Sequence, residues 1–413
     1  MWSDPLTALF TATSAVSVTG VSVVDVGTFY SFWGQLIIAL LVQIGGLGYM
    51  SATTFLLLLL GRQFGLKDRL ALQQSLEIPK LAGVVQIVRS IVVTTIVIEL
   101  LGMLLLIPVF LPEYGLKYGL FLAYFYSVNA FNNAGFSLFS NGLNSYVASP
   151  LINLVLPGLI ILGGIGYQAI AELYLWLRTR LDRDPTCVNF SLNFKVVTST
   201  TVFLLILGTI ALLGAEFNNP TTLGHLSLNQ KLLAAWFQSV TARSGGFNTI
   251  TTGQLTTVSL LLMIVLMFIG ASPGSTGSGI KTTTLRVLLN CTSATLQGRK
   301  EVLCYQRQIP LELIMKAVSV IVGSLLVVIV ATTLIALSDP QLDLIKLLFE
   351  VVSAFGTVGL STGITASISA TGQLVLIATM YIGRVGVLLL MSAILGNPSP
   401  SALSYPEENL LVG

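Results

Sequence analysis

Four short segments of the chain share a pattern centred on glycine and could bind a cation through backbone carbonyl oxygens. They read SAVSVTGVS, NAFNNAGFS, TARSGGFNT and SAFGTVGLS, at residues 14–22, 129–137, 241–249 and 353–361. The shared glycines are the seventh residue of the first, second and fourth segments and the sixth of the third, and they recur at intervals of 115, 111 and 113 residues. Glycine lets the backbone adopt conformations closed to other residues, and rings of carbonyls replace the hydration shell of an ion in potassium filters.

None of the four segments contains aspartate or glutamate. A divalent-cation pore built on rings of carboxylates is therefore disfavoured. For a single glycine, close packing between helices would be the better explanation. Four glycines at matched positions favour an ion filter.

A modest apolar stretch precedes each segment and is too short to cross a membrane. These stretches are residues 5–17, 118–131, 231–240 and 342–355. About 13 helical residues extend only about 20 Å, whereas the hydrocarbon core is about 30 Å thick. We expect re-entrant half-helices, each directing the partial negative charge of its carboxyl end toward its glycine segment.

Longer apolar runs flank these units. Full spans are predicted after the glycine segments, at residues 33–60, 151–177, 258–296 and 372–395, and before the last three half-helices, at 84–111, 195–217 and 309–337. The expected fold is an all-α polytopic membrane protein with four pseudo-symmetric repeats of span, pore helix, filter and span around one pore. The repeats and a cytoplasmic tail are predicted at residues 1–60, 84–177, 195–296, 309–395 and 396–413. The first repeat begins without its leading span. Either the start of the chain is truncated or the protein has seven spans, and the symmetry of the repeats favours truncation.

The composition supports this membrane assignment. Of 413 residues, 54% are hydrophobic and 9% are charged, whereas soluble domains have about 25% charged residues. Eleven basic residues lie in the loops at 61–83, 178–195 and 298–308, against three in the linkers that enter the half-helices. The positive-inside rule therefore places these loops in the cytoplasm and the half-helices on the outer side.

Residues suited to catalysis or structural metal binding are scarce. His225 is the only histidine, and the cysteines Cys187, Cys291 and Cys304 lack the spacing of a zinc site or a disulfide framework. The apolar spans contain no paired carboxylates and no Ser/Lys pair. We expect neither an enzyme nor a bound cofactor, and we interpret His225 as a solvated or packed loop residue.

The motifs together resemble the Trk/Ktr/HKT superfamily of potassium transporters, and most of all the KtrB-like membrane subunits of bacterial Ktr uptake systems. Besides the glycine segments, the resemblance rests on QIGGLGYM at 43–50, LGGIGYQ at 162–168, LMFIGASPGSTGSGIKTTT at 266–284 and MYIGRVG at 380–386. It covers essentially the whole chain.

This resemblance implies that the glycine segments form the selectivity filter and bind potassium. The implied filter residues are Val18, Thr19, Gly20, Val21, Asn133, Ala134, Gly135, Phe136, Ser244, Gly245, Gly246, Phe247, Thr357, Val358, Gly359 and Leu360. Glycine at all four key positions is typical of potassium-selective members, whereas serine in the first repeat accompanies sodium permeation in some plant relatives. The third segment has Ser244-Gly245 where relatives often have Thr-Ala, a difference that bears on the strength of selectivity.

The span at 258–296 is interrupted by glycines and a proline that cannot remain helical, and a broken span points to a permeation path. The resemblance implies an intramembrane loop that obstructs the pore below the filter as a gate, together with an arginine that contacts it. The implied gate residues are Gly270, Ala271, Ser272, Pro273, Gly274, Ser275, Thr276, Gly277, Ser278, Gly279 and Arg384. A nucleotide P-loop is disfavoured, because Ile280 separates Gly279 from Lys281-Thr282.

Arg384 and Glu99 lie well inside apolar spans, where an ionised group is costly. Arg384 is interpreted as a functional cation near the pore, with a packing role in capping carbonyls as the alternative. For Glu99, helix pairing and a functional role are equally consistent with the sequence.

The expected function is potassium uptake across the plasma membrane of a bacterium. A sodium-permeable or non-selective monovalent cation conduit is the alternative, and sodium as a coupling or activating ion is left open. The resemblance further implies a homodimer in membrane lipid, on a cytosolic ring of KtrA-like nucleotide-binding regulatory subunits. No nucleic-acid partner is expected.

Overall fold

The computed structural model describes residues 4–48, 84–182, 189–299, 301–387 and 390. The predicted loop at 61–83, the final parts of the first and last predicted spans (49–60, and 388–395 apart from residue 390), and the tail at 396–413 lie outside these residues.

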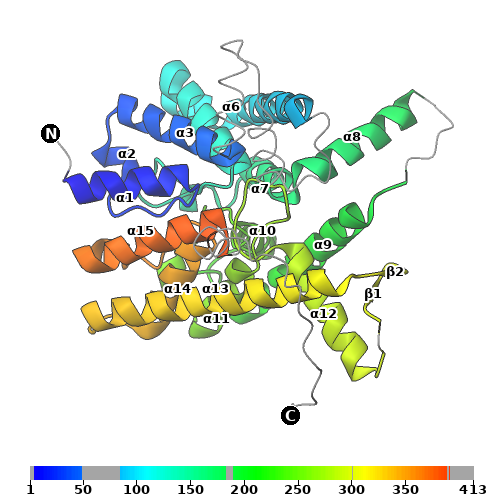
Figure 1. The fold of residues 1–413 in the computed structure, drawn as a ribbon. Coiled ribbons are helices and arrows are strands. Elements are labelled where there is room, and N and C mark those ends of the chain that lie inside the picture. The colour runs from blue at the N-terminus through cyan, green and yellow to red at the C-terminus, as the bar shows by residue number, and fades with distance from the viewer. Residues whose placement is uncertain (1–3, 49–83, 183–188, 300, 388–389, 391–413) are drawn as a thin grey trace.

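The described chain is mostly helical (Figure 1). The α-helices are α1 (Pro5–Val16), α2 (Val26–Phe29), α3 (Phe32–Leu47), α6 (Val84–Phe131), α7 (Pro150–Ile165), α8 (Tyr167–Leu181), α9 (Leu192–Glu216), α10 (Leu228–Thr241), α11 (Thr257–Phe268), α12 (Thr282–Leu296), α13 (Leu311–Ser338), α14 (Leu344–Phe355) and α15 (Ala370–Val385). Single 3₁₀ turns are η1 (Asn144–Tyr146), η2 (Thr252–Gln254) and η3 (Thr365–Ser367), and β1 (Leu303–Cys304) pairs antiparallel with β2 (Arg307–Gln308). By length and composition, α6, α9 and α13 can each cross a membrane, and so can α7 with α8 if this bent pair is one span.

Short apolar helices lead into all four glycine segments, as the sequence predicts. They are α1, α10, α14 and the last part of α6. Local signals start them: Pro5 occupies the first turn of α1, Ser227 and Gln230 form a capping box on α10, and the Asp343 side chain accepts from the amide of Ile345 at the start of α14. In α6 the predicted span and half-helix are separated only by Gly115, whose φ of 73° is not helical.

Three of the helices that follow the glycine segments end at a glycine inside a predicted span. The predicted span at 151–177 is wrong in this respect, because it consists of α7 and α8, which meet at an angle of 106°. Gly48, Gly166 and Gly386 follow α3, α7 and α15 with φ of 78°, 94° and 88°. Only glycine adopts this backbone at little cost. A helix end at a left-handed glycine is therefore common to three helices, besides the predicted interruption after α11.

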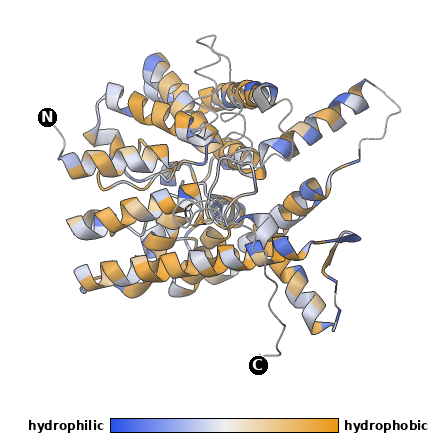
Figure 2. Cartoon of the chain, viewed as in Figure 1, coloured by the Kyte–Doolittle hydropathy of each residue, from blue (hydrophilic) through white to orange (hydrophobic). Residues whose placement is uncertain are grey.

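Two hydrophobic cores surround the glycine segments. One is formed mainly by α1, α3, α6 and α7 around side chains such as Phe125 and Phe131, and the other by α11, α13, α14 and α15 around Met263 and Phe349. Figure 2 shows apolar residues along these helices. At one end it shows hydrophilic residues on the β1–β2 hairpin and, alternating with apolar ones, on α8. Arg178, Arg180 and Arg307 lie there, which agrees with a cytoplasmic end.

At the end opposite α8 and the β1–β2 hairpin, acidic residues connect two pairs of helices. In each pair, a helix that precedes a half-helix (a leading helix) is bonded to the start of the helix that follows the glycine segment (a trailing helix). Glu216, the last residue of α9, accepts from the amide and the hydroxyl of Thr256, at 2.8 and 2.7 Å. Asp339, directly after α13, accepts from the amide and the hydroxyl of Ser369, at 3.1 and 2.7 Å. Thr256 and Ser369 are the N-caps of α11 and α15. The two carboxylates therefore fix the same junction in two parts of the chain.

Replacing Asp339 by alanine should lower stability by about 2 kcal/mol, because a buried charged acceptor and its hydrogen bonds are lost. Burial raises the pKa of Asp339, but the hydrogen bonds from Ser369 and Ser338 outweigh it and hold the pKa below its usual value. The contribution is therefore complete above the unfolded pKa of about 4 and is lost as pH falls through the lower folded pKa. Thermal unfolding of the purified variant should show a constant deficit from pH 7 to pH 5 that shrinks below pH 4. A deficit independent of pH would contradict an ionised Asp339.

Candidate functional site

The four glycine segments share one backbone conformation. In each, a non-glycine residue with left-handed φ is followed by one residue outside that region and then by a left-handed glycine. The pairs are Val18 (59°) and Gly20 (89°), Asn133 (61°) and Gly135 (72°), Ser244 (65°) and Gly246 (75°), and Thr357 (46°) and Gly359 (96°). A residue held in a sparsely populated region costs about 1–3 kcal/mol. The same strain at four matched positions indicates a functional constraint.

The endings of the half-helices explain the first left-handed residue of each pair. After α1, the amide of Thr19 donates to the carbonyl of Ser14 at 2.7 Å, which spans the left-handed Val18. This bond across a left-handed residue is a Schellman ending. The second and fourth segments repeat it at 2.8 Å, from Ala134 to Asn129 and from Val358 to Ser353, whereas in the third Thr241 accepts from Gly245 at 2.8 Å.

The segments converge so that each glycine lies against the backbone of another segment. A Cβ atom placed on the glycine would lie 1.8 Å from the Ala134 oxygen for Gly20, 3.2 Å from the Gly245 oxygen for Gly135, 2.5 Å from the Val358 oxygen for Gly246 and 2.4 Å from the Thr19 oxygen for Gly359. These contacts join the segments in a closed cycle of four. Carbonyl oxygens from four matched residues therefore lie around the point where the glycines meet.

The remaining segment residues are anchored in the protein. The residues that follow the glycines are at most 3% exposed: Val21, Phe136, Phe247 and Leu360. Of the residues that precede them, Thr19, Ala134 and Val358 are fully buried. Packing of these side chains fixes the backbone, which leaves the carbonyls as the groups available at the centre.

A cavity of about 310 Å³ opens on one side of the cycle. Residues of all four segments line it, among them the four glycines. Its lining is polar and includes one carboxylate, Asp25, which accepts from the amide of Gly27 at 3.0 Å and from the hydroxyl of Ser140. A hydrated cation can therefore reach the carbonyls from this cavity.

The loop between α11 and α12 lies against the opposite side of the cycle, where the half-helices end. It is anchored in the break between α7 and α8 by three backbone bonds of 3.0 to 3.2 Å, from Ser272 to Gly164, from Thr276 to Gly163 and from Tyr167 to Gly274. The hydroxyl of Thr276 also donates to the carbonyl of Phe131 at 3.2 Å. Phe131 ends α6 and lies two residues before the left-handed Asn133, so the loop contacts the base of the second segment.

Arg384 connects this loop with two trailing helices. From α15, its guanidinium donates to the Thr276 carbonyl and to the Ser278 hydroxyl in the loop, and to the Gly45 carbonyl in α3. Hydrogen bonds from a charged donor are about twice as strong as neutral ones. One side chain therefore holds the loop to the first and fourth parts of the chain.

Buried acids support two of the segments, and the sequence analysis missed one of them. Glu350 in α14 is 1% exposed and accepts hydrogen bonds of 2.7 to 3.1 Å from Ser361, Thr362 and Thr365, just after the fourth segment. The hydroxyl-rich run STGIT after Gly359 is the signal that could have indicated it. Glu99 in α6 accepts from the side-chain amide of Asn132 at 2.8 Å.

Among the described residues, no group of three or more His, Cys, Asp or Glu side chains could hold a metal ion. His225 lies in an exposed loop, with its Nδ1 atom 3.3 Å from the carbonyl of Pro220.

A protein family and several known proteins are similar to this chain over nearly its whole length. Residues 2–405 match a family model described as "TrkH: Cation transport protein". The chain is 39% identical over 412 residues to the "Ktr system potassium uptake protein B" of Bacillus subtilis (strain 168), an alignment that covers all of this chain and 90% of that protein. It is 38% identical to the protein of the same name from Vibrio alginolyticus, with 98% of this chain and 88% of that protein covered.

Two further similarities bear on substrate and fold. The chain is 33% identical to the "Potassium/sodium uptake protein NtpJ" of Enterococcus hirae, with 98% of this chain and 89% of that protein covered. Its structure is similar to the crystal structure of the potassium transporter TrkH from Vibrio parahaemolyticus, with a TM-score of 0.74 and 17% identity over 96% of this chain and 79% of that one. At this identity the structural similarity establishes the fold alone.

Proposed function

Because this chain belongs to the TrkH family of cation transport proteins, we propose that it takes up potassium through a filter of backbone carbonyls. It is a membrane-embedded transporter and not an enzyme. Two relatives that align with this chain over nearly their full length are named potassium uptake proteins. These names support potassium as the substrate.

The observation that carries the proposal is the cycle of four matched carbonyls, from Thr19, Ala134, Gly245 and Val358. Carbonyl rings replace the hydration shell of potassium. The carboxyl ends of four half-helices add partial negative charge at the same place. The four glycine segments, Val18–Val21 and their counterparts in the other three repeats, act as one filter around a single pore.

The loop at 270–279 acts as the gate below this filter, and Arg384 holds the loop in its closed position. The contacts of Thr276 and Ser278 with Arg384, and of Thr276 with Phe131, support this assignment. A segment held across a path by a few hydrogen bonds can open at low cost, because each bond contributes only about 1 kcal/mol net.

The protein works as a homodimer on a KtrA-like cytosolic nucleotide-binding ring. The names of the relatives, which describe them as parts of a Ktr system, support a multi-component transporter. The hydrophilic end formed by α8 and the β1–β2 hairpin is the surface on which such a ring docks (Figure 2). Copurification with a ring-forming cytosolic partner, lost when Arg307 is replaced by glutamate, tests this arrangement.

Growth of a potassium-uptake-deficient bacterium at micromolar potassium tests the main proposal, with rubidium, potassium and sodium fluxes measured in parallel. We expect rescue and a flux of potassium and rubidium well above that of sodium. Equal sodium flux would favour a non-selective conduit, the alternative that the similarity to NtpJ supports. An expressed, membrane-inserted protein that gives neither rescue nor flux would contradict the proposal.

Replacing Asp25 by asparagine should weaken potassium capture at the outer cavity. Asparagine caps helix α2 as well as aspartate does, so the substitution removes the charge with little structural effect. We expect the half-saturating potassium concentration to rise about threefold at low ionic strength and the difference to vanish near 1 M inert salt, because salt screens an exposed charge. Ser140→Ala, which keeps the carboxylate, should behave like the wild type, and an effect independent of salt would contradict this role for Asp25.

A further inference from the structure

Arg243 immediately precedes the left-handed residue of the third segment, and its side chain is 7% exposed. One guanidinium nitrogen donates to the carbonyl of Gly270 at 3.2 Å. Gly270 is the first residue of the intramembrane loop. A side chain of the glycine segment therefore contacts the loop at its base, at a point that Arg384 does not reach.

The guanidinium has few other partners. Its Nε atom has no hydrogen-bond acceptor, and within the described part of the chain no carboxylate lies within ion-pair distance of it. A buried charged donor that loses its acceptor is strongly destabilised. Movement of Gly270 away from Arg243 therefore costs free energy. Because Arg243 belongs to the third segment, this movement also affects that segment.

The base of the loop is built to transmit such a movement. Gly270 lies where the loop closes on itself, because the amide of Ala271 donates to the carbonyl of Ser278 at 3.1 Å. A Cβ atom on Gly277 would lie 3.2 Å from the Cβ of Ser244, and the Ser244 hydroxyl donates to the Gly356 carbonyl at 3.3 Å. The loop therefore contacts the third segment at two successive residues, one of which also bonds to the end of α14.

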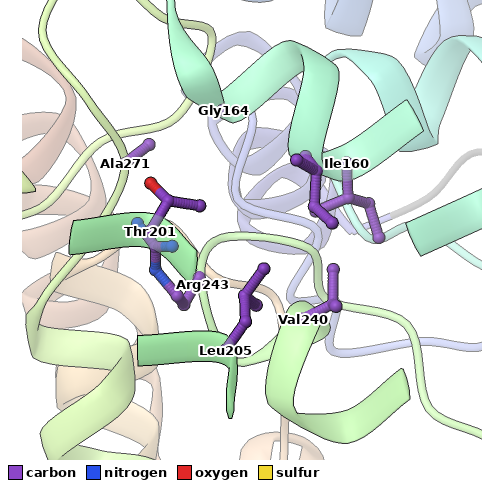
Figure 3. A pocket seen from close by; sticks show the side chains of 8 residues that line it. Ile160, Gly164, Thr201, Leu205, Val240, Arg243 and Ala271 are labelled. Atoms are coloured by element: carbon purple, nitrogen blue, oxygen red, sulfur yellow. The ribbon is translucent and has the colours of Figure 1, made fainter. Parts of the chain in front are cut away.

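A small cavity gives the guanidinium room to follow the loop. It has a volume of about 20 Å³ and lies between α7, α9, α10 and the loop (Figure 3). Arg243, Thr201 and Ala271 all line this cavity and are labelled near one another in Figure 3. Such a volume holds about one water molecule, so the side chain can shift here without displacing the packed core.

We propose that Arg243 is a positioning residue that couples the filter to the loop, so that the position of the loop changes ion selectivity and occupancy of the filter changes the position of the loop. Coupling of this kind acts equally in both directions. The proposal deepens the potassium uptake function above and depends on it only for its transport measurement.

A double-mutant cycle tests the coupling. Arg243→Met removes the guanidinium and keeps an apolar stem. Deletion of residues 274–277 removes the bond from Thr276 to Gly163 and the bond from Arg384 to Thr276, while keeping Gly270. We expect Arg243→Met to raise the sodium-to-potassium flux ratio about tenfold with the intact loop and less than about twofold with the shortened loop. Arg243→Lys, which keeps a charged donor, should restore part of the selectivity.

Thr201→Val is the matched control, because it removes a cavity-lining hydroxyl that has no hydrogen-bond partner. This variant should match the wild type in flux ratio. An equal effect of Arg243→Met with the intact and the shortened loop would show that Arg243 only packs, and would overturn the coupling. Size-exclusion profiles select folded variants. If Arg243→Met does not fold, Arg243→Lys replaces it in the cycle. We then expect the sodium-to-potassium flux ratio to rise about threefold with the intact loop and not to change with the shortened loop.

Hydrogen exchange separates this proposal from the proposed function, because it requires no transport. We expect potassium, compared with choline, to slow exchange of residues 270–279 in the wild type but not in Arg243→Met. Loop protection that is identical in the two proteins would overturn the coupling even if potassium is transported. Loss of potassium-dependent protection in the variant would support it even if the flux assay finds another transported ion.

Discussion

Serine in place of Gly20 is expected to raise the sodium-to-potassium flux ratio at least about tenfold, which corresponds to about 1.4 kcal/mol of lost discrimination. A Cβ atom at this position would lie 1.8 Å from the carbonyl oxygen of Ala134, closer than any real contact. The backbone φ of 89° is also unfavourable for a residue with a side chain. The Ala134 carbonyl must therefore move, and one of the four oxygens no longer faces the ion as in the wild type.

The matched control is Gly214→Ser in α9, where a Cβ atom would have no neighbour within 4 Å. Serine at Gly214 adds the same side chain without disturbing the carbonyl cycle, so its flux ratio should equal that of the wild type. Sodium, potassium and rubidium fluxes measured on equal amounts of inserted protein provide the comparison. An unchanged ratio in a well-folded Gly20→Ser protein would show that these carbonyls do not select the ion.

The half-helices could be predicted because each of their parts leaves a local signal. Equal spacing of four glycines, short apolar stretches before them and caps such as Ser227 and Asp343 act within a few residues of sequence. The half-helices α1, α10 and α14 accordingly begin and end within about three residues of their predicted bounds. The assignment of the sixteen segment residues as a filter remains a prediction that the Gly20 experiment tests.

The breaks in the trailing helices could not be predicted in the same way. Only the interruption at 270–279 contains a proline and enough glycines to exclude a helix from composition alone. Gly166 has no proline near it, and isolated glycines are tolerated inside apolar helices. Its left-handed φ is decided by tertiary contacts, because the amide of Tyr167 bonds to the loop residue Gly274.

The same reason explains why the partners of buried charges were missed. Arg384 was identified from its cost in an apolar span, but its acceptors, Thr276 in the loop and Gly45 in α3, lie 108 and 339 residues away in the chain. Glu350 gave no such signal, because a single acid in a short helix is common. Its role depends on the return of Ser361 and Thr365 to the same place after the fourth segment.

Deletion of residues 274–277 is expected to raise potassium flux about tenfold and to weaken its control by any cytosolic partner. The deletion removes the Thr276 bonds to Gly163 and Phe131 and the bond from Arg384 to Thr276. Net loss of about one hydrogen bond is enough, because a tenfold shift requires only about 1.4 kcal/mol. Initial rates of rubidium uptake at saturating concentration, on equal amounts of inserted protein, measure the effect.

Ser275→Ala is the control for this deletion. Ser275 donates within the loop, to the carbonyl of Ser272 at 2.6 Å, and makes none of the anchoring bonds. If the anchoring bonds hold the loop across the path, Ser275→Ala should conduct potassium at the wild-type rate. Only the variant that lacks the anchoring bonds should conduct it faster. Equal or lower flux in a folded deletion variant that still prefers potassium would mean that residues 270–279 support the fold of the pore and do not gate it.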